Sequence, residues 1–252
     1  MTRFRITLEY DGTDLIGWQE NRQGPSVQSI LRDAIYAFCG VRPDIVAAGR
    51  TDAGVHALGM VAHFDLDGAF DANTVMRAVN FYLAEKPVVI LSCDVVADDF
   101  NARFDCTARH YRYVVLNRRA APVLNKNRVW WVPRKLNIDA MRDAATHLIG
   151  HHDFTSFRAT QCQAKSPIKT LDACNIITDG DDVIFEFSAR SFLHHQVRNM
   201  VGTLVEIGLG KPYDIDEIFA VCNRSAAGPT APASGLYFIS ADYSTDASHS
   251  DI

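Results

Sequence analysis

One short stretch of the sequence places a carboxylate where it could act as a nucleophile. Residues 48–57 read AGRTDAGVHA, with Asp52 near the middle. Two glycines flank the Arg-Thr-Asp core, so the backbone can turn tightly and present the carboxylate at the tip of a loop. Arg50 and Thr51 can keep that carboxylate ionised and oriented. Asp52 could instead cap a turn or a helix, and the residues of the loop alone favour this second interpretation.

Strands and helices that could position this loop follow in the first hundred residues. Apolar and polar side chains alternate over residues 3–10, which predicts a half-buried strand. Apolar residues recur at helical spacing from Val27 to Phe38, with Ser26 as the N-cap and Gly40 as the terminator. The patterns further along predict a strand at 58–65, a helix at 72–83 and a strand at 88–96.

The second part of the chain repeats this mixture of elements. The patterns predict strands at 110–116 and 236–240, a hairpin of 171–177 and 183–188, and helices at 138–149, 193–208 and 214–222. We therefore expect an α+β fold of two similar domains, each a mainly antiparallel sheet with packed helices, and an active-site cleft between them. The expected domains are 1–104 and 105–243, followed by a frayed polar tail at 244–252.

Composition restricts the class of protein. The chain has 252 residues, 48% of them hydrophobic and 22% charged, as is typical of globular proteins. No apolar run approaches the roughly 20 residues needed to span a bilayer, and the N-terminus lacks the apolar core of a signal peptide, so we expect a cytoplasmic protein without a membrane segment. The six cysteines are scattered singly along the chain, and this spacing argues against a disulfide framework and against a structural zinc site.

Charge is unevenly distributed along the chain. The net charge is −5, yet residues 103–135 hold nine Lys or Arg against the single acid Asp105. Aromatic residues, including Tyr111 and Tyr113, are interleaved with these cations. A nucleic-acid backbone with unstacked bases requires such a combination. Cations that alternate on the solvent face of strands would produce the same pattern, so charge alone leaves both interpretations open.

The Asp52 segment closely resembles the active-site motif of the tRNA pseudouridine synthase A family, whose members isomerise uridine to pseudouridine in the anticodon stem-loop. Five further blocks resemble the family in the correct order and run through almost the whole chain. These blocks are 10–13 with 17–19, 108–113, 152–157, 192–202 and 230–237. The resemblance implies the pseudouridine synthase fold and positions 38–40 of several tRNAs as the target.

Carried over residue by residue, the resemblance implies four site residues. The nucleophilic aspartate falls on Asp52, and the tyrosine that contacts the substrate falls on Tyr111. The arginine that pairs with the aspartate falls on Arg198, and Arg50 is a second basic group beside the nucleophile. Tyr111 could instead be a core aromatic of its strand, but a ring held against an extruded base agrees better with its place in the family motif.

The implied reaction needs no redox cofactor, metal or ATP, because uridine and pseudouridine contain the same atoms. We therefore expect no cofactor and no metal. Adjacent histidines such as His151-His152 and His194-His195 diverge on a strand or a helix, which disfavours a metal site. The resemblance also implies a homodimer that binds tRNA. The alternative function is a catalytically silent RNA-binding or RNA-folding module on the same scaffold, which would be expected to lack Asp52 or Tyr111; a metal-dependent nuclease or deaminase is a more distant alternative.

Overall fold

The computed structural model describes residues 1–244, so the tail expected at 244–252 lies almost entirely outside the described residues. Contacts between Cα atoms divide the chain into two compact units. Unit 1 contains Met1–Arg109 and the described C-terminal residues from Tyr237, and unit 2 contains His110–Leu236. Each unit is described here by itself.

Unit 1 is built on a mainly antiparallel sheet. Strand β1 (Thr2–Tyr10) pairs antiparallel with β3 (His56–Leu66) on one side and with β4 (Val88–Val96) on the other. The two-residue strand β2 (Val46–Ala47) pairs with β3, and β11 (Leu236–Tyr243) runs parallel to the start of β3. Side chains alternate strictly along β1, so Phe4, Ile6 and Leu8 are buried on one face.

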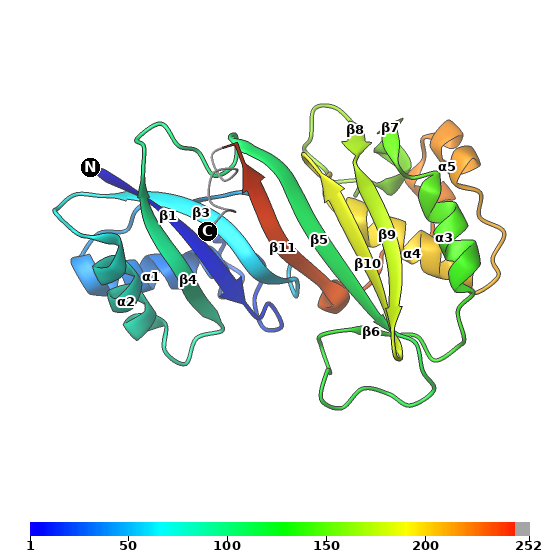
Figure 1. Cartoon of the computed structure of the whole chain (residues 1–252), viewed down its shortest axis with the longest axis horizontal. Helices are drawn as coiled ribbons and strands as arrows, with labels where there is room; N and C mark the ends of the chain where they lie inside the picture. The colour runs from blue at the N-terminus through cyan, green and yellow to red at the C-terminus, as the bar shows by residue number, and fades with distance from the viewer. Residues whose placement is uncertain (245–252) are drawn as a thin grey trace, which may run out of the picture. The chain divides into compact units, whose positions relative to one another are not determined.

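Two helices complete unit 1, and both were predicted from the sequence. Helix α1 (Val27–Cys39) begins after the N-cap Ser26 and ends at Gly40, whose positive φ of 74° stops the helix. Helix α2 (Ala72–Leu83) and strand β4 have the predicted bounds. The two helices pack against each other, and α2 lies against β4 (Figure 1). Their buried stripes, which include Leu31 and Val75, close the core of this unit.

Unit 2 contains a run of neighbouring strands and a small two-stranded sheet. The hairpin of β9 (Ala173–Asp179) and β10 (Asp182–Ala189) is antiparallel, and β10 neighbours β5 (Cys106–Leu116), most of which lies in this unit. Strand β6 (Trp130–Trp131) runs parallel to the end of β5. Strands β7 (Gly150–Asp153) and β8 (Ile168–Leu171) form a separate two-stranded sheet.

The helices of unit 2 pack against one another and against strand β9. Helix α3 (Ile138–Thr146) packs against α4 (Gln196–Gly208) and β9, and α5 (Ile215–Val221) packs near the short 3-10 helix η1 (Phe154–Phe157). Two further 3-10 helices, η2 (Arg224–Ala226) and η3 (Ala233–Gly235), follow α5.

Two predicted helices are shorter in the structure. The helix predicted at 193–208 starts at Gln196, because His195 has a positive φ of 64° and the Gln196 side chain accepts the Leu193 N–H at 2.8 Å. The helix predicted at 138–149 ends at Thr146.

The two units differ from the expected domain boundaries in two places. Residues 237–243 were expected in the second domain, but they belong to unit 1 because Tyr237 and Phe238 pair with His56 and Ala57 of β3. The division after Arg109 also comes five residues beyond the expected one at 104. The expected α+β class with mainly antiparallel strands is confirmed. None of the helices within residues 1–244 is long and apolar enough to cross a membrane.

Candidate active site

Asp52 lies in the loop between β2 and β3 of unit 1. The chain turns after this residue: the Val55 N–H donates to the Asp52 carbonyl at 3.2 Å, and Gly54 has a positive φ of 79°. Asp52 itself is half-buried, whereas Arg50 is exposed on the same loop. The loop therefore presents both predicted residues without burying either one completely.

The segment that follows β1 holds this loop from one side. The Trp18 N–H donates to the Thr51 carbonyl at 3.0 Å, and the Gly54 N–H donates to the Leu15 carbonyl at 3.2 Å. A buried hydrogen bond of 2.8 Å joins the Tyr10 hydroxyl to the Thr51 hydroxyl. Thr51, the residue directly before Asp52, is thus held by both its main chain and its side chain.

Two glycines allow this close approach. A Cβ atom at Gly17 would lie 2.5 Å from the Thr51 carbonyl oxygen, and Gly17 also has a positive φ of 101°. A Cβ atom at Gly12 would overlap the carbonyl oxygen of Val55. Only glycine leaves room for the backbone at these two positions. The first block of the family motif, residues 10–13 with 17–19, therefore forms one wall of the Asp52 loop.

Arg109 holds the other end of the loop. Its side chain is buried, with Nε donating to the Ala48 carbonyl at 2.8 Å and Nη2 donating to the Arg103 carbonyl at 2.7 Å. A buried guanidinium that donates to main-chain carbonyls is satisfied inside the protein. Arg109 belongs to the basic segment 103–135, and its position contradicts the interpretation of that whole segment as a nucleic-acid surface.

His56 packs at the base of the loop. Its Nδ1 atom accepts the Gly12 N–H at 3.1 Å, and its ring stacks on Tyr237 with 4.9 Å between the ring centroids. The ring is buried, so His56 has a packing role in unit 1. Gly12, His56 and Tyr237 are separated along the chain and meet only in the folded sheet, so these contacts could not be read from the sequence.

Tyr111 lies on β5 in unit 2 and is half-buried. Its ring meets Phe192 edge to face, with 5.1 Å between centroids and an angle of 84° between the planes. Tyr113, two residues further on, is completely buried, and its hydroxyl donates to the Pro232 carbonyl at 2.8 Å. Burial raises the pKa of Tyr113 well above its ordinary value. Tyr113 is thus a core residue, whereas Tyr111 retains exposed surface.

Arg198 lies on the first turn of α4 in unit 2 and is half-buried. Its Nε atom donates to the Ala231 carbonyl at 2.8 Å, and the Ala231 N–H donates back to the Arg198 carbonyl at 3.1 Å. This reciprocal pair ties the helix to the segment before η3. The Arg198 guanidinium is therefore held through its Nε atom by the backbone carbonyl of Ala231.

A buried polar network next to Arg198 holds the same segment. The Asn199 side chain, which has no exposed surface, donates to the Phe157 carbonyl at 2.7 Å and accepts from Arg224 at 3.0 Å and Thr230 at 2.6 Å. The Thr203 hydroxyl accepts the Gly228 N–H at 2.9 Å. Three family blocks, 152–157, 192–202 and 230–237, thus meet around α4. The sequence showed their order but not that Asn199 joins them.

Besides the exposed Arg103, the remaining cations of the basic segment fall into two groups. Arg112 pairs with Glu186 at 2.9 Å on neighbouring strands, as expected for the solvent face of a sheet. Six others lie on or beside the loop between β5 and β6 and are exposed: Arg118, Arg119, Lys126, Arg128, Arg134 and Lys135. Of these, Arg118 also pairs with Asp181 at 3.4 Å. Arg112 therefore agrees with the solvent-face interpretation, and the interpretation of the six exposed cations as a nucleic-acid surface stays a prediction.

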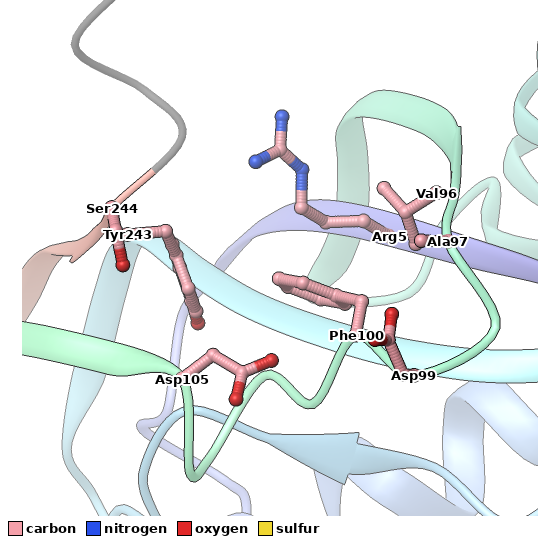
Figure 2. A pocket seen from close by; sticks show the side chains of 8 residues that line it. All are labelled: Arg5, Val96, Ala97, Asp99, Phe100, Asp105, Tyr243 and Ser244. Carbon is pink, nitrogen blue, oxygen red and sulfur yellow. The ribbon is translucent and has the colours of Figure 1, made fainter.

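A hollow of about 310 Å³ lies elsewhere in unit 1. Figure 2 shows Phe100 and Tyr243 beside it, with the carboxylates of Asp99 and Asp105 at its edge. None of the four predicted site residues lines this hollow. Its lining consists of Arg5, Val96, Ala97, Asp99, Phe100, Asp105, Tyr243 and Ser244.

Known proteins resemble this chain over nearly its whole length. A family model described as tRNA pseudouridine synthase matches residues 144–244. Proteins named tRNA pseudouridine synthase A are 50% identical in Rhodospirillum rubrum, 49% in Paramagnetospirillum magneticum and 53% in Rhodospirillum centenum. These matches cover 95%, 97% and 96% of this chain and 87%, 96% and 100% of the relatives, respectively.

One solved structure, titled as a complex of Cbf5, Nop10 and Gar1, matches 80% of this chain and 44% of its own chain, with a TM-score of 0.35 and 11% identity, a likeness too low to support a conclusion. The close relatives, together with the α+β fold, define the class of protein: an isomerase that acts on RNA. The chain belongs to the tRNA pseudouridine synthase family, and it converts uridine to pseudouridine in tRNA.

Proposed function

We propose that this protein isomerises uridines at positions 38–40 of the anticodon stem-loop, with Asp52 as the nucleophile. The observation that carries the proposal is the Asp52 loop itself. It contains the family's motif, it leaves the carboxylate half-buried, and hydrogen bonds from both Trp18 and Tyr10 hold the preceding residue. A carboxylate held in this way can meet a substrate in a reproducible geometry.

The reaction breaks the N1–C1′ bond of uridine, turns the uracil and joins C5 to C1′. The proton lost from C5 is balanced by the proton gained at N1, so nothing is oxidised or reduced. An ionised Asp52 can serve in three ways: by capturing positive character at C1′, by adding to C6 of the ring, or by removing the C2′ proton. All three routes need the same ionised carboxylate, which acts as a nucleophile in the first two and as a base in the third.

Three other residues assist Asp52 in this proposal. Tyr111, half-buried on β5, lies against the extruded base, because a base inside a helix cannot be detached and turned. Arg198 pairs with the carboxylate and keeps it ionised, since a cation within about 4–6 Å favours the charged form. Arg50, exposed on the Asp52 loop, is the second basic group. The active protein is a homodimer that works in the cytoplasm, without a cofactor or a metal.

The test is incubation with unmodified tRNA followed by chemical mapping of pseudouridine. Asp52→Asn removes the reacting charge and preserves the shape of the side chain, so we expect turnover to fall by roughly a thousandfold or more while tRNA affinity stays within a few-fold. Asp14→Asn, an exposed aspartate of the same unit, is the matched control and should retain wild-type activity. Substantial turnover by Asp52→Asn would contradict the assignment, and modification outside positions 38–40 would contradict the proposed target.

A further inference from the structure

The loop between β5 and β6, residues 117–129, combines positive charge with exposed apolar side chains. Residues 117–135 contain six Lys or Arg and no Asp or Glu. Figure 1 shows this loop extending beyond the ends of the strands of unit 2. Arg119, Lys126 and Arg128 are exposed on it. The loop therefore carries a positive field on a part of the unit that protrudes from the sheet.

The base of the loop is firmly anchored. The Asn117 side chain donates to the carbonyls of Val132 at 2.8 Å and Arg134 at 2.6 Å, and it accepts the Leu136 N–H at 3.1 Å. The Trp131 indole N–H donates to the Arg118 carbonyl at 2.8 Å. These bonds join the two ends of the loop across 13 to 19 positions of the chain. The residues between them are consequently presented from a fixed frame.

The tip of the loop exposes two aliphatic side chains. Val123 is 83% exposed and Leu124 is 93% exposed, and within residues 1–244 no large hydrophobic side chain is more exposed than Leu124. Isolated exposed apolar residues are common, but two adjacent ones at the tip of an anchored, acid-free loop are a candidate contact surface. Such a pair contributes favourably to a free energy of binding only when a partner covers it.

We propose that the tip formed by Val123 and Leu124 packs against bases of the tRNA while the cations of the loop contact neighbouring phosphates. RNA suits both features of the loop, because it is a polyanion and its unpaired bases offer flat apolar faces. Apolar side chains that insert beside bases, flanked by cations on the backbone, are an established mode of nucleic-acid binding. The proposal rests on tRNA as the substrate and is independent of the role of Asp52.

A second copy of the chain is the competing occupant of this surface. Contact between the loop and the same loop of another copy is disfavoured, because two acid-free basic segments repel each other. A tRNA partner supplies the opposite charge without that cost. The oligomeric state of each variant therefore has to be measured together with its affinity for tRNA.

The experiment compares two pairs of variants in the full-length protein. Leu124→Ser removes most of the apolar surface at the tip, and Leu124→Met retains it. Val221→Ser, at a 58% exposed valine on α5, is the matched control for placing a serine on the surface of unit 2. Lys126→Ala tests the charge of the same loop. Each variant is titrated with unmodified tRNA at several salt concentrations, and its mass in solution is determined by light scattering.

We expect Leu124→Ser to weaken tRNA binding by about tenfold, as loss of a buried leucine contact would. The slope of log K against log[salt] should stay unchanged, because no charge is removed. Leu124→Met and Val221→Ser should bind like wild type. Lys126→Ala should lower the magnitude of the salt slope by about 0.7–0.9 if its ammonium contacts one phosphate.

Two results would overturn the proposal. Unchanged tRNA affinity in Leu124→Ser would show that RNA does not cover the tip. A shift of Leu124→Ser to a smaller assembly would assign the tip to contact between copies, whether or not affinity also fell. Either result leaves Asp52→Asn to be judged by pseudouridine mapping, because binding and chemistry are read separately.

Discussion

The two units hold their predicted site residues by different means. In unit 1, Asp52 lies on a loop that is held largely by main-chain hydrogen bonds and by the close approach of Gly12 and Gly17. In unit 2, Arg198 lies on a helix that is held by buried polar side chains centred on Asn199. The backbone of a loop has no regular internal hydrogen bonds, so neighbouring segments must provide partners for its N–H and C=O groups. A helix satisfies most of its own backbone groups, so only its position relative to neighbouring elements has to be fixed.

This difference indicates which kind of substitution each unit tolerates. The Asp52 loop should be sensitive to any added Cβ atom at its glycine contacts, with effects on the chemistry before effects on folding. The environment of α4 should be sensitive to the loss of individual polar side chains, with effects on folding first. Four substitutions, two in each unit, test this contrast.

Among the substitutions that test this contrast, Gly12→Ala should cause the largest loss of activity. Its Cβ atom would overlap the Val55 carbonyl oxygen, so the segment after β1 and the Asp52 loop must move apart. A displacement of about 1 Å at a reacting group can cost a hundredfold, and we expect a fall in kcat of that order. Gly24→Ala is the control, because its Cβ atom would meet only the Ile16 side chain at 3.2 Å. Equal rates for the two variants would show that the close approach does not position Asp52.

Asn199→Ala should destabilise the fold. The substitution removes the side-chain donor to the Phe157 carbonyl and one of the four hydrogen bonds of the Arg224 guanidinium. Loss of several buried hydrogen bonds costs about 2–4 kcal/mol of the free energy of unfolding. Urea denaturation measures this change, and Asn175→Ala on the exposed side of β9 is the control. A change in kcat at full stability would instead place the role of Asn199 in the reaction.

Arg198→Lys should impair catalysis by roughly tenfold although the charge is retained. A planar guanidinium can donate to the Ala231 carbonyl and to a carboxylate at once, whereas an ammonium cannot reproduce that geometry. The measurement is single-turnover kinetics at saturating tRNA. Arg142→Lys, whose Nε atom also donates to a carbonyl, serves as the control. Wild-type kcat in Arg198→Lys would contradict the proposed pairing with Asp52.

Tyr10→Phe should have the smallest effect. It removes only the hydroxyl that bonds to Thr51, so the side chain beside Asp52 loses one restraint while the main-chain bonds remain. One neutral hydrogen bond is worth about 1 kcal/mol, which corresponds to a decrease in kcat of about fivefold if that restraint positions Asp52. Tyr243→Phe removes a comparable bond to Ala102 in the same unit and should leave kcat unchanged. The idea fails if both variants slow the reaction equally.

Much of the secondary structure could be predicted from the sequence, whereas the roles of the four candidate residues stay predictions. Helix 72–83 and strand 88–96 have the predicted bounds because their apolar periodicity is local and uninterrupted. The predicted start of α4 was wrong because the observed start depends on the backbone of His195. This non-glycine residue has a positive φ, which the pattern of apolar residues does not indicate. Asp52 and Tyr111 could be named because the motifs around them are contiguous in the chain.

The sequence by itself determined the element types, the family and the order of its motifs, since each of these depends on neighbours in the chain. The folded structure was needed to show that Arg109 is a buried anchor of the Asp52 loop and that the six cations of residues 118–135 are exposed. It also decided that β11 completes unit 1. Burial and hydrogen-bond partners depend on contacts between residues that are distant in the chain. Arg109 and the Ala48 carbonyl, for example, are 61 positions apart, so the pattern of charged residues does not indicate which carbonyl a given side chain contacts.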